Sequence, residues 1–370
     1  MGIIILLLVQ NLVFGLYIAY RIYVSFFKKY NVILIMGIIL VINNIFLITR
    51  LLNKYAGITV PDWVILCAHI IFGISVYVLL LFLITDVLRI IANIIKKPFI
   101  SFKLQGIIVI SLSLLIFIYG YINSHYTNIT EYNVVLNKEV TKPFRIAAVS
   151  DIHIGADMSP KRLLKEVEII NNQNPDIILL AGDMIDNNVN DFTEDHIKAF
   201  NNLKAPLGVY AVYGNHEYYS GSFDEVFSLF TKAGFNTLVD NVTYINDYNF
   251  YILGRDSLRH TNSNGSERKQ IEEFSALIED KSKPLIILDH VPKGLTDGKK
   301  INADIQISGH THDGQFFPVN LIVRHLNVLS HGIINDNGFY YIVSSGLGLW
   351  GPPMRVGTKS EIVIINVSGK

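Results

Sequence analysis

The stretch Ser308–Pro318, SGHTHDGQFFP, places His310 and His312 one residue apart, with Asp313 beside them. It follows DIQI, and the two together are typical of the end of a buried strand. A single histidine is usually a core or surface residue that makes one hydrogen bond. The pair therefore indicates a site only if comparable polar residues follow other strands, and the rest of the chain supplies them.

Polar residues follow further short apolar runs between residues 143 and 310. These runs are FRIAAVS before Asp151, DIILLAG before Asp183, LGVYAVYG before Asn215 and PLIILD before His290. Stretches with helical spacing alternate with them, such as PKRLLKEVEIINNQ and FDEVFSLFTKAG. Alternating strands and helices predict an α/β domain with a largely buried sheet. Because ligands gather at the carboxyl ends of such strands, we expect the polar clusters to meet at one rim.

The first third of the chain is more apolar than the rest. The whole sequence is 51% hydrophobic, which exceeds the content of an ordinary soluble protein. Within residues 1–123, runs long enough to cross a bilayer predict four transmembrane helices, at about 2–23, 32–52, 63–84 and 104–122. The first run has no basic residue before it and no clear small-residue cleavage site, which favours a retained helix over a signal peptide.

Basic residues between the apolar runs predict how the chain crosses the membrane. The first connection carries Arg21, Lys28 and Lys29, and the third carries Arg89, Lys96, Lys97 and Lys103. These connections are expected on the cytoplasmic side, although Arg50 and Lys54 in the second connection oppose the bias. The region after Ile122 should then lie outside the cytoplasm, at the cell membrane.

Charge divides the chain unevenly. Residues 1–123 contain nine Lys and Arg against two Asp and Glu, whereas residues 124–370 contain 22 against 29. The acidic second part argues against nucleic-acid binding, which needs a basic face. Asp86 and Arg89, at helical spacing, are expected to form an interfacial ion pair, which gives little support to a transporter. Cys67 is the only cysteine and excludes both an intrachain disulfide and a Cys-based zinc site.

Taken in order, the clusters D-x-H, G-D, G-N-H-E, H and G-H-T-H resemble the calcineurin-like metallophosphoesterase superfamily over roughly residues 143–368. The fragments that carry the resemblance are SDIHIG, AGDMID, YGNHEYY, LDHVP and SGHTHDGQFFP. The tail VSSGLGLWGPPMRVGTKSEIVIINV is similar to a membrane-associated branch that includes enzymes resembling UDP-diacylglucosamine pyrophosphatase. A glycine is common in that branch where this chain has Asp313, so the substrate does not carry over with the ligands.

This resemblance implies a four-layer α/β sandwich with two divalent ions, Mn, Fe, Zn or Mg, at the carboxyl ends of the strands. It implies one ion held by Asp151, His153 and His312, a second held by Asn215, His290 and His310, and Asp183 bridging the two. Such a pair of ions, about 3.5–4 Å apart, clamps a phosphate and activates water. His216 is implied as the proton donor to the leaving group, so that His216 and Asp183 are the expected catalytic residues.

An extended segment would point His310 and His312 to the same side, since side chains alternate with a period of two. Gly309 would let the backbone approach closely there. Nearby residues have two interpretations each. Arg355 either recognises phosphate or forms a structural ion pair. Glu217 and Asp186 either support the ligands or serve as surface and capping residues.

The expected protein is a membrane-anchored phosphoesterase that cleaves a phosphate ester or pyrophosphate bond, with a phosphorylated lipid or cell-envelope precursor as one candidate substrate. The alternatives are a phosphodiesterase acting on soluble nucleotides or other small phosphoesters, a metal-binding scaffold without catalysis, and a channel regulated by the domain. GLGLWGPPM, residues 346–354, is either an apolar lip for a lipid or a packed loop. Residues 124–142 are expected to be a linker, with a candidate opening strand around YNVVLN, before a catalytic domain at 143–370.

Overall fold

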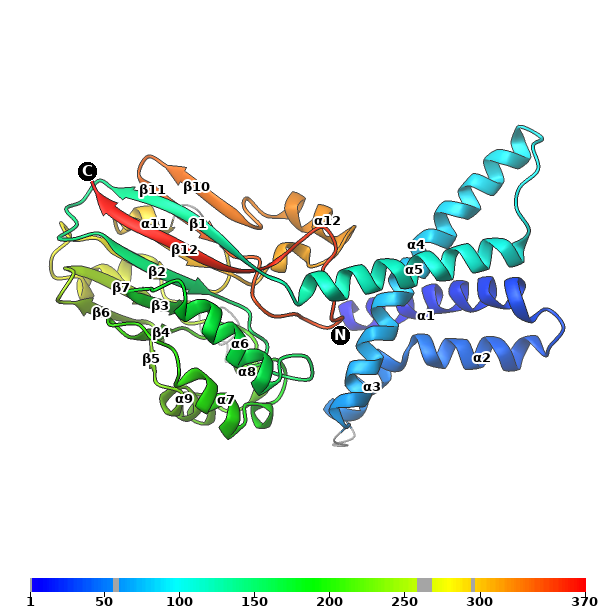
Figure 1. Cartoon of the computed structure of the whole chain (residues 1–370), viewed down its shortest axis with the longest axis horizontal. Helices are drawn as coiled ribbons and strands as arrows, with labels where there is room; N and C mark the ends of the chain where they lie inside the picture. The colour runs from blue at the N-terminus through cyan, green and yellow to red at the C-terminus, as the bar shows by residue number, and fades with distance from the viewer. Residues whose placement is uncertain (1, 56–59, 258–267, 294–296) are drawn as a thin grey trace. The chain divides into compact units, whose positions relative to one another are not determined.

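The computed structural model describes residues 2–55, 60–257, 268–293 and 297–370, with the side chains of 2–11, 50–51 and 53–55 outside that description. The chain divides into two compact units (Figure 1). One unit consists of residues 1–122 with 351–354, and the other of residues 123–350 with 355–370.

The first unit is helical. Its elements are α1 (Gly2–Ile22), the π-helical turn η1 (Tyr23–Phe27), α2 (Val32–Asn43), α3 (Ile45–Tyr55), α4 (Asp62–Ile94) and α5 (Phe102–Ser124). Within the described residues, two helices, α4 and α5, are long and apolar enough to cross a membrane. The structure therefore supports two spans of full length where the sequence predicted four. The first predicted span, 2–23, falls partly on side chains outside the description.

Within the predicted span 32–52 the helix is interrupted at Asn44. The Asn43 side chain donates to the Ile39 carbonyl at 3.0 Å, and the Asn44 side chain donates to the Leu40 carbonyl at 2.9 Å. Such side-chain bonds compete with the backbone for its hydrogen-bond partners. The result is α2, with 12 residues, followed by the separate helix α3. Twelve residues are too few to cross a bilayer.

A polar network joins α1, α4 and α5. The Asp86 carboxylate accepts from Tyr17 at 2.8 Å and pairs with Arg21 at 2.9 Å. The Gln105 amide donates to Asp86 at 2.9 Å and accepts from Arg89 at 2.6 Å. Gln105 is thus placed between Arg89 and Asp86, and the carboxylate pairs with Arg21 on a neighbouring helix. The predicted Asp86–Arg89 pair is therefore wrong.

The described strands of the second unit form two six-stranded mixed sheets. The first has the order β1 (Thr127–Leu136), β12 (Ser360–Gly369), β2 (Phe144–Val149), β3 (Ile177–Leu180), β4 (Val209–Ala211) and β5 (Phe235–Thr237). The second has the order β10 (Gly332–Asp336), β11 (Phe339–Val343), β9 (Ile305–Ser308), β8 (Leu285–Leu288), β7 (Phe250–Gly254) and β6 (Asn241–Ile245). The candidate strand around YNVVLN corresponds to β1, which pairs in parallel with β12. The predicted α/β class is confirmed, and both sheets are mixed.

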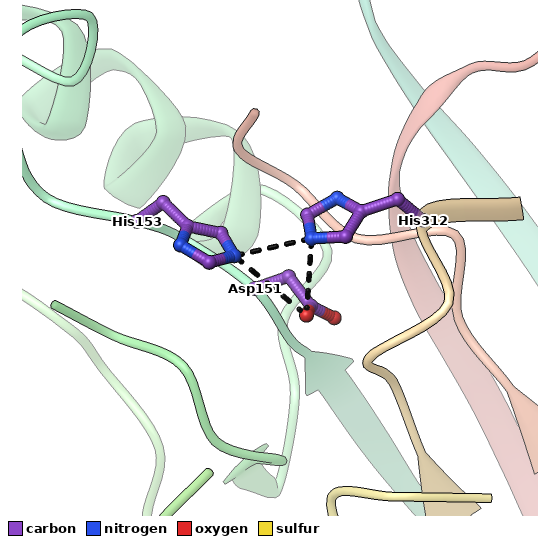
Figure 2. A group of neighbouring side chains, drawn as sticks. All are labelled: Asp151, His153 and His312. Carbon is purple, nitrogen blue, oxygen red and sulfur yellow. Dashed lines mark hydrogen bonds and ion pairs between the residues drawn. The ribbon is translucent and has the colours of Figure 1, made fainter. Parts of the chain in front are cut away.

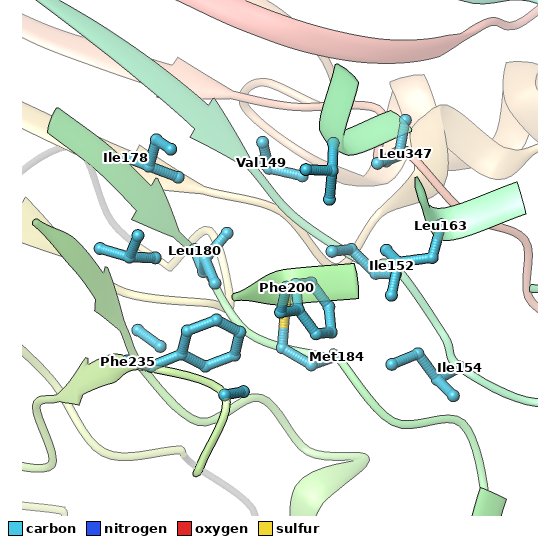
Figure 3. Packing of buried hydrophobic residues seen from close by; sticks show 14 of the residues in the cluster. Val149, Ile152, Ile154, Leu163, Ile178, Leu180, Met184, Phe200, Phe235 and Leu347 are labelled. Atoms are coloured by element: carbon cyan, nitrogen blue, oxygen red, sulfur yellow. The ribbon is translucent and has the colours of Figure 1, made fainter. Parts of the chain in front are cut away.

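Alternate residues of the central strands face different layers, as the period of two requires. In β2, Ile146 and Ala148 pack between the two sheets, whereas Ala147 and Val149 face a helical layer. That layer consists of α6 (Pro160–Asn171), α7 (Glu194–Phe200) and α9 (Phe223–Lys232). Figure 3 shows Val149 and Leu180 among the residues of this cluster, with Leu163 and Phe200 from the helices.

The outer face of the second sheet is covered by the three-ten helix η3 (Ile271–Leu277), whose Ile271 and Phe274 pack on Leu253 and Ile287. The layers therefore run helix, sheet, sheet, helix. The remaining short elements are η2 (Val189–Asp191), α8 (Glu217–Ser220), α11 (Asp297–Lys300), η4 (His312–Gly314) and α12 (Val319–Leu326).

Candidate metal centre

The polar residues that follow β2, β3, β4, β8 and β9 come together at one place. β2, β3 and β4 are parallel neighbours in the first sheet, and β8 and β9 are parallel neighbours in the second. Among the described His, Cys, Asp and Glu residues, possible ligand atoms lie within 4.8 Å of one another in the groups Asp151, His153, His312; His153, Asp183, His216; and Asp183, His290, His310. Loops from both sheets thus contribute to a single cluster.

Figure 2 shows the first of these groups, Asp151, His153 and His312. The Nε2 atoms of His153 and His312 are 3.1 Å apart, and His312 Nε2 is 3.4 Å from an Asp151 carboxylate oxygen. All three residues are buried. Imidazole nitrogens and a carboxylate oxygen that converge in this way form a donor set for a divalent cation.

Asp183 lies between this group and the next. Its Oδ2 is 3.0 Å from His290 Nε2 and 3.9 Å from His153 Nε2. His290 Nδ1 donates to the Ala181 carbonyl at 2.8 Å, which directs Nε2 toward Asp183. Burial lowers the pKa of His290, but the negative charge of Asp183 outweighs it and raises the pKa to about 10. A carboxylate in this position suits a bridging ligand.

Asn215 provides an independent test of whether metal ions fit this cluster. Its side-chain oxygen is buried and has no hydrogen-bond partner among the described residues. A buried oxygen without a partner costs about 1–3 kcal/mol, and a bound cation would satisfy it. Together with the imidazoles and carboxylates, the Asn215 oxygen would complete a nitrogen and oxygen donor set that suits divalent ions such as Mn, Fe and Zn. The residues present therefore fit two ions.

The backbone of the candidate ligands is strained. Asp151, His153, Asp183, His310 and His312 have φ values of 55°, 49°, 56°, 70° and 48°. Non-glycine residues rarely adopt this left-handed region, and such strain is concentrated at functional sites. The predicted extended segment through His310 and His312 is therefore wrong, because left-handed turns aim the two rings instead.

The contact between Asp151 and the loop after β9 explains this conformation. The His310 backbone N–H donates to both carboxylate oxygens of Asp151, at 3.1 and 3.0 Å. A Cβ atom on Gly309 would come within 1.8 Å of Ser150 Oγ, so only glycine permits this approach. The close approach expected of Gly309 is present, although the extended geometry is not.

Glu217 supports the loops that carry the ligands. Its carboxylate is 1% exposed and accepts hydrogen bonds from the backbone N–H groups of Asp183, Met184 and Gly214, at 3.0, 2.7 and 2.7 Å. Burial and the neighbouring Asp183 raise the pKa of Glu217 to about 7. Of the two interpretations of this residue, a surface role is wrong.

His216 is held at the edge of the cluster by contacts at both its backbone and its ring. Its backbone N–H donates to Asp183 Oδ1 at 2.8 Å, and its ring Nδ1 donates to the Asp186 carbonyl. This leaves Nε2 for contact with a substrate. Burial lowers the pKa of His216. The Asp186 carboxylate lies 3.4 Å from His153 Nδ1 and therefore orients that ring.

Arg355 has a structural role. Its fully buried guanidinium donates to the carbonyls of Ser345, Gly346 and Gly348, at 2.7, 3.0 and 2.9 Å. Burial lowers its pKa to about 10. The phosphate-recognition interpretation is therefore wrong. Arg355 has the structural role that the other interpretation gave it, but it bonds to backbone carbonyls and does not form the predicted ion pair.

The segment GLGLWGPPM is mostly packed. Leu347, Leu349 and Met354 are 1%, 6% and 0% exposed, whereas Trp350 is 44% exposed. The lip interpretation is wrong for Leu347, whose side chain lies in the core cluster beneath the helical layer, whereas residues 351–354 belong to the helical unit.

Asp313, where the chain departs from the resembling branch, is not placed as a metal ligand. It is buried, and its carboxylate accepts from Arg324 at 2.9 and 2.5 Å and from the Ser330 hydroxyl at 2.8 Å. Asp313 thus ties the loop of His312 to α12.

Comparisons with known proteins agree with this geometry. Residues 144–314 match the family described as Calcineurin-like phosphoesterase. The chain is 34% identical to an uncharacterized metallophosphoesterase of Campylobacter jejuni, over 62% of this chain and 60% of the relative. It is 31% identical to another from Aquifex aeolicus, over 68% and 96%. It is also 26% identical to a zebrafish (Danio rerio) transmembrane protein with metallophosphoesterase domain, over 72% and 63%.

The chain belongs to the calcineurin-like phosphoesterase family, a family of metal-dependent phosphoester hydrolases. It spans somewhat less than two thirds of the length of the Campylobacter and zebrafish relatives.

Proposed function

We propose that this protein is a membrane-anchored phosphoesterase that uses two divalent metal ions to hydrolyse a phosphate ester or pyrophosphate bond. The observation that carries the proposal is the position of Asp183. Its carboxylate lies between the imidazoles of His153 and His290, which belong to different groups of candidate ligands. A shared carboxylate between two sets of nitrogen and oxygen donors is what a dinuclear centre requires.

The candidate ligands divide between two ions as the family resemblance implies. Asp151, His153 and His312 would hold one, Asn215, His290 and His310 the other, and Asp183 both. When bound, two such ions neutralise charge that develops on a phosphate and lower the pKa of water.

In its doubly protonated form, His216 would give the Nε2 proton to the leaving-group oxygen while its Nδ1–H stays bonded to the Asp186 carbonyl. Asp186 also keeps the His153 ring in place, and Glu217 keeps the Asp183 loop in place.

A membrane location is favoured by α4 and α5, which have the length and composition of spans, and by relatives named as transmembrane proteins. Lys28, Lys29, Lys96 and Lys97 lie in the connections that we assign to the cytoplasm. On this assignment the catalytic unit lies on the outer side of the membrane.

A phosphorylated lipid or a lipid-linked envelope precursor is the substrate class that we favour. The support is the short connection between α5, which ends at Ser124, and β1, which begins at Thr127. So short a connection would hold the phosphoesterase unit close to a bilayer that α5 crosses.

The test is an assay of the full chain, purified in detergent and loaded with Mn²⁺. The substrates are an aryl phosphodiester, an aryl phosphomonoester, a soluble nucleotide, a phospholipid, a polyprenyl phosphate and a nucleotide-diphosphate lipid. Turnover that disappears in Asp183→Asn, with the lipid-linked compounds turned over fastest, is expected. A protein that holds two metals but hydrolyses none of them would contradict catalysis, and preference for the soluble nucleotide would contradict the lipid assignment.

A further inference from the structure

Helix α12 exposes apolar side chains and buries a polar one. Leu321, Ile322 and Leu326 are 54%, 58% and 74% exposed, whereas Asn320 is 4% exposed. A helix packed on a soluble domain normally turns its apolar residues toward the core. α12 reverses this arrangement.

The exposed residues continue beyond both ends of the helix. Phe317 precedes it with 47% exposure, and Val328 follows it with 75% exposure. We call Phe317, Leu321, Ile322, Leu326 and Val328 the α12 apolar face. Single exposed apolar residues are normal, but a group of large ones on one element marks a surface that contacts a membrane or another protein.

This face is held in place by the site loop. Arg324, on α12, donates to the Asp313 carboxylate at 2.9 and 2.5 Å, and Asp313 directly follows the candidate ligand His312. The Ser330 hydroxyl donates to the same carboxylate at 2.8 Å. The α12 apolar face therefore has a fixed relation to the metal centre.

The chain itself indicates what covers this face. The Asn123 side chain, in the last turn of α5, donates to the carbonyls of Arg355 and Thr358 at 2.9 and 3.0 Å. Arg324 donates to the carbonyl of Gly357, between them, at 3.3 Å. The segment 355–358 thus contacts both α12 and the end of a helix that is long and apolar enough to cross a membrane. Asn123, the segment 355–358 and α12 all belong to the second compact unit, so the end of the candidate span is tied to the part of that unit that carries α12.

We propose that the α12 apolar face lies in the interfacial layer of the bilayer and holds the metal centre at the level of lipid headgroups. Helices with one apolar face bind there by burying that face at the boundary between headgroups and acyl chains. This inference rests on the membrane anchoring within the proposed function, and its test separates the two.

The test uses the full chain with Cys67→Ser, reconstituted in phosphatidylcholine and phosphatidylglycerol vesicles. A thiol-reactive fluorophore is attached at Leu326→Cys. The matched control carries the fluorophore at Leu164→Cys, because Leu164 is a 39% exposed leucine on α6. A third variant, Ile118→Cys, reports whether α5 is inserted in the bilayer, since Ile118 is 52% exposed on that helix. Quenching by a lipid-borne nitroxide is compared with quenching by aqueous iodide, and Ile322→Cys repeats the measurement if the first variant does not fold.

The probe at residue 326 should be quenched several times more strongly by the lipid nitroxide than the probe at 164, and less by iodide. Equal behaviour at 326 and 164, with residue 118 quenched by lipid, would overturn the inference and leave the anchoring intact. Shielding of 326 from both quenchers would also overturn it and would indicate a protein partner, such as a second copy. If residue 118 is not quenched by lipid, the anchoring itself fails.

Discussion

His153 Nε2 lies 3.1 Å from His312 Nε2, although the two residues follow strands of different sheets, β2 and β9. Two neutral imidazoles that face each other through unprotonated nitrogens repel, and a proton or a cation between them removes the repulsion. Binding of a cation between His153 and His312 should therefore stabilise the contact between the two sheets.

Removal of divalent ions should lower stability as well as activity. Ions that bind only the native state at 100 times their Kd stabilise it by about 2.7 kcal/mol. We expect chelation to lower the Tm of the full chain in detergent and Mn²⁺ to restore it. In His312→Ala the response to chelator should be smaller, because a ligand is missing. If chelator does not change the Tm of the unaltered protein, the two-ion assignment is contradicted.

Asp183→Asn should remove activity and lower metal content together. A neutral amide cannot bridge two dications as a carboxylate does. Altering groups that only support metal ligands costs about 10–100-fold, so the loss here should be at least about 100-fold. Metal content is measured by mass spectrometry, and turnover is measured with an aryl phosphodiester as substrate. The control is Asp195→Asn, whose carboxylate is 70% exposed and which should change neither. Two bound metals with normal turnover in Asp183→Asn would refute the bridge.

His216→Ala should separate proton donation from metal binding. Metal content should hold, while the rate falls by about 10²–10⁴-fold, most for esters with poor leaving groups. The measurement is a leaving-group series of aryl phosphoesters. Since His216 also lies near His153 and Asp183, loss of metal in this variant would identify it as a ligand instead. Equal losses across the series would remove it from the role of proton donor.

The location of the site could be predicted from the sequence, but not its local geometry. Polar residues after successive parallel strands must gather at strand ends, which is why Asp151, Asp183 and His310 were expected together. The left-handed turn at His310 depends on its N–H donating to Asp151 in the other sheet. That bond exists only once both sheets are packed. The burial of Glu217 likewise depends on tertiary structure, because its carboxylate accepts from the backbone N–H of Asp183 in the loop after β3.

The membrane region was predicted less well, and one signal was available. Hydropathy reports length and composition, but Asn43 and Asn44 stand side by side within the run 32–52. Their amides bond to carbonyls of the preceding turn, which ends α2. From the sequence, Arg21 was counted only among the basic residues of the first connection. Its pairing with Asp86 arises from the packing of two helices that lie far apart in the sequence.

Asp313→Ala should destabilise the protein more than Asp313→Gly. Both variants leave Arg324 and Ser330 without their carboxylate partner. Asp313 has φ of 49°, a conformation that glycine adopts freely and alanine does not. The difference between the two should be about 1 kcal/mol in favour of glycine, measured by thermal unfolding. Arg324→Gln tests the ion pair alone and should cost less than either, because Arg324 is 48% exposed on its side chain. A more stable alanine variant would contradict the strained backbone.

The pair of His331 and Glu361 should make stability depend on pH. Burial raises the pKa of Glu361, but the hydrogen bond from His331 at 3.0 Å, with others, outweighs it and lowers the pKa to about 2. The same bond raises the pKa of His331 above its ordinary 6.5. The contribution of Glu361 is therefore lost as pH falls below about 4.5, and that of His331 is lost as pH rises through its raised pKa.

Comparison of the unaltered protein with His331→Ala isolates this effect. The stability difference should be largest near pH 5.5 and should shrink as pH rises through the raised pKa of His331. We expect a difference on the order of 1 kcal/mol, since the His331 side chain is 38% exposed and solvent screens the pair. Unfolding in urea at several pH values measures the stability of both proteins. A difference for His331→Ala that grows toward pH 8.5 would reverse the sign and show that the neutral imidazole is the form that the fold prefers.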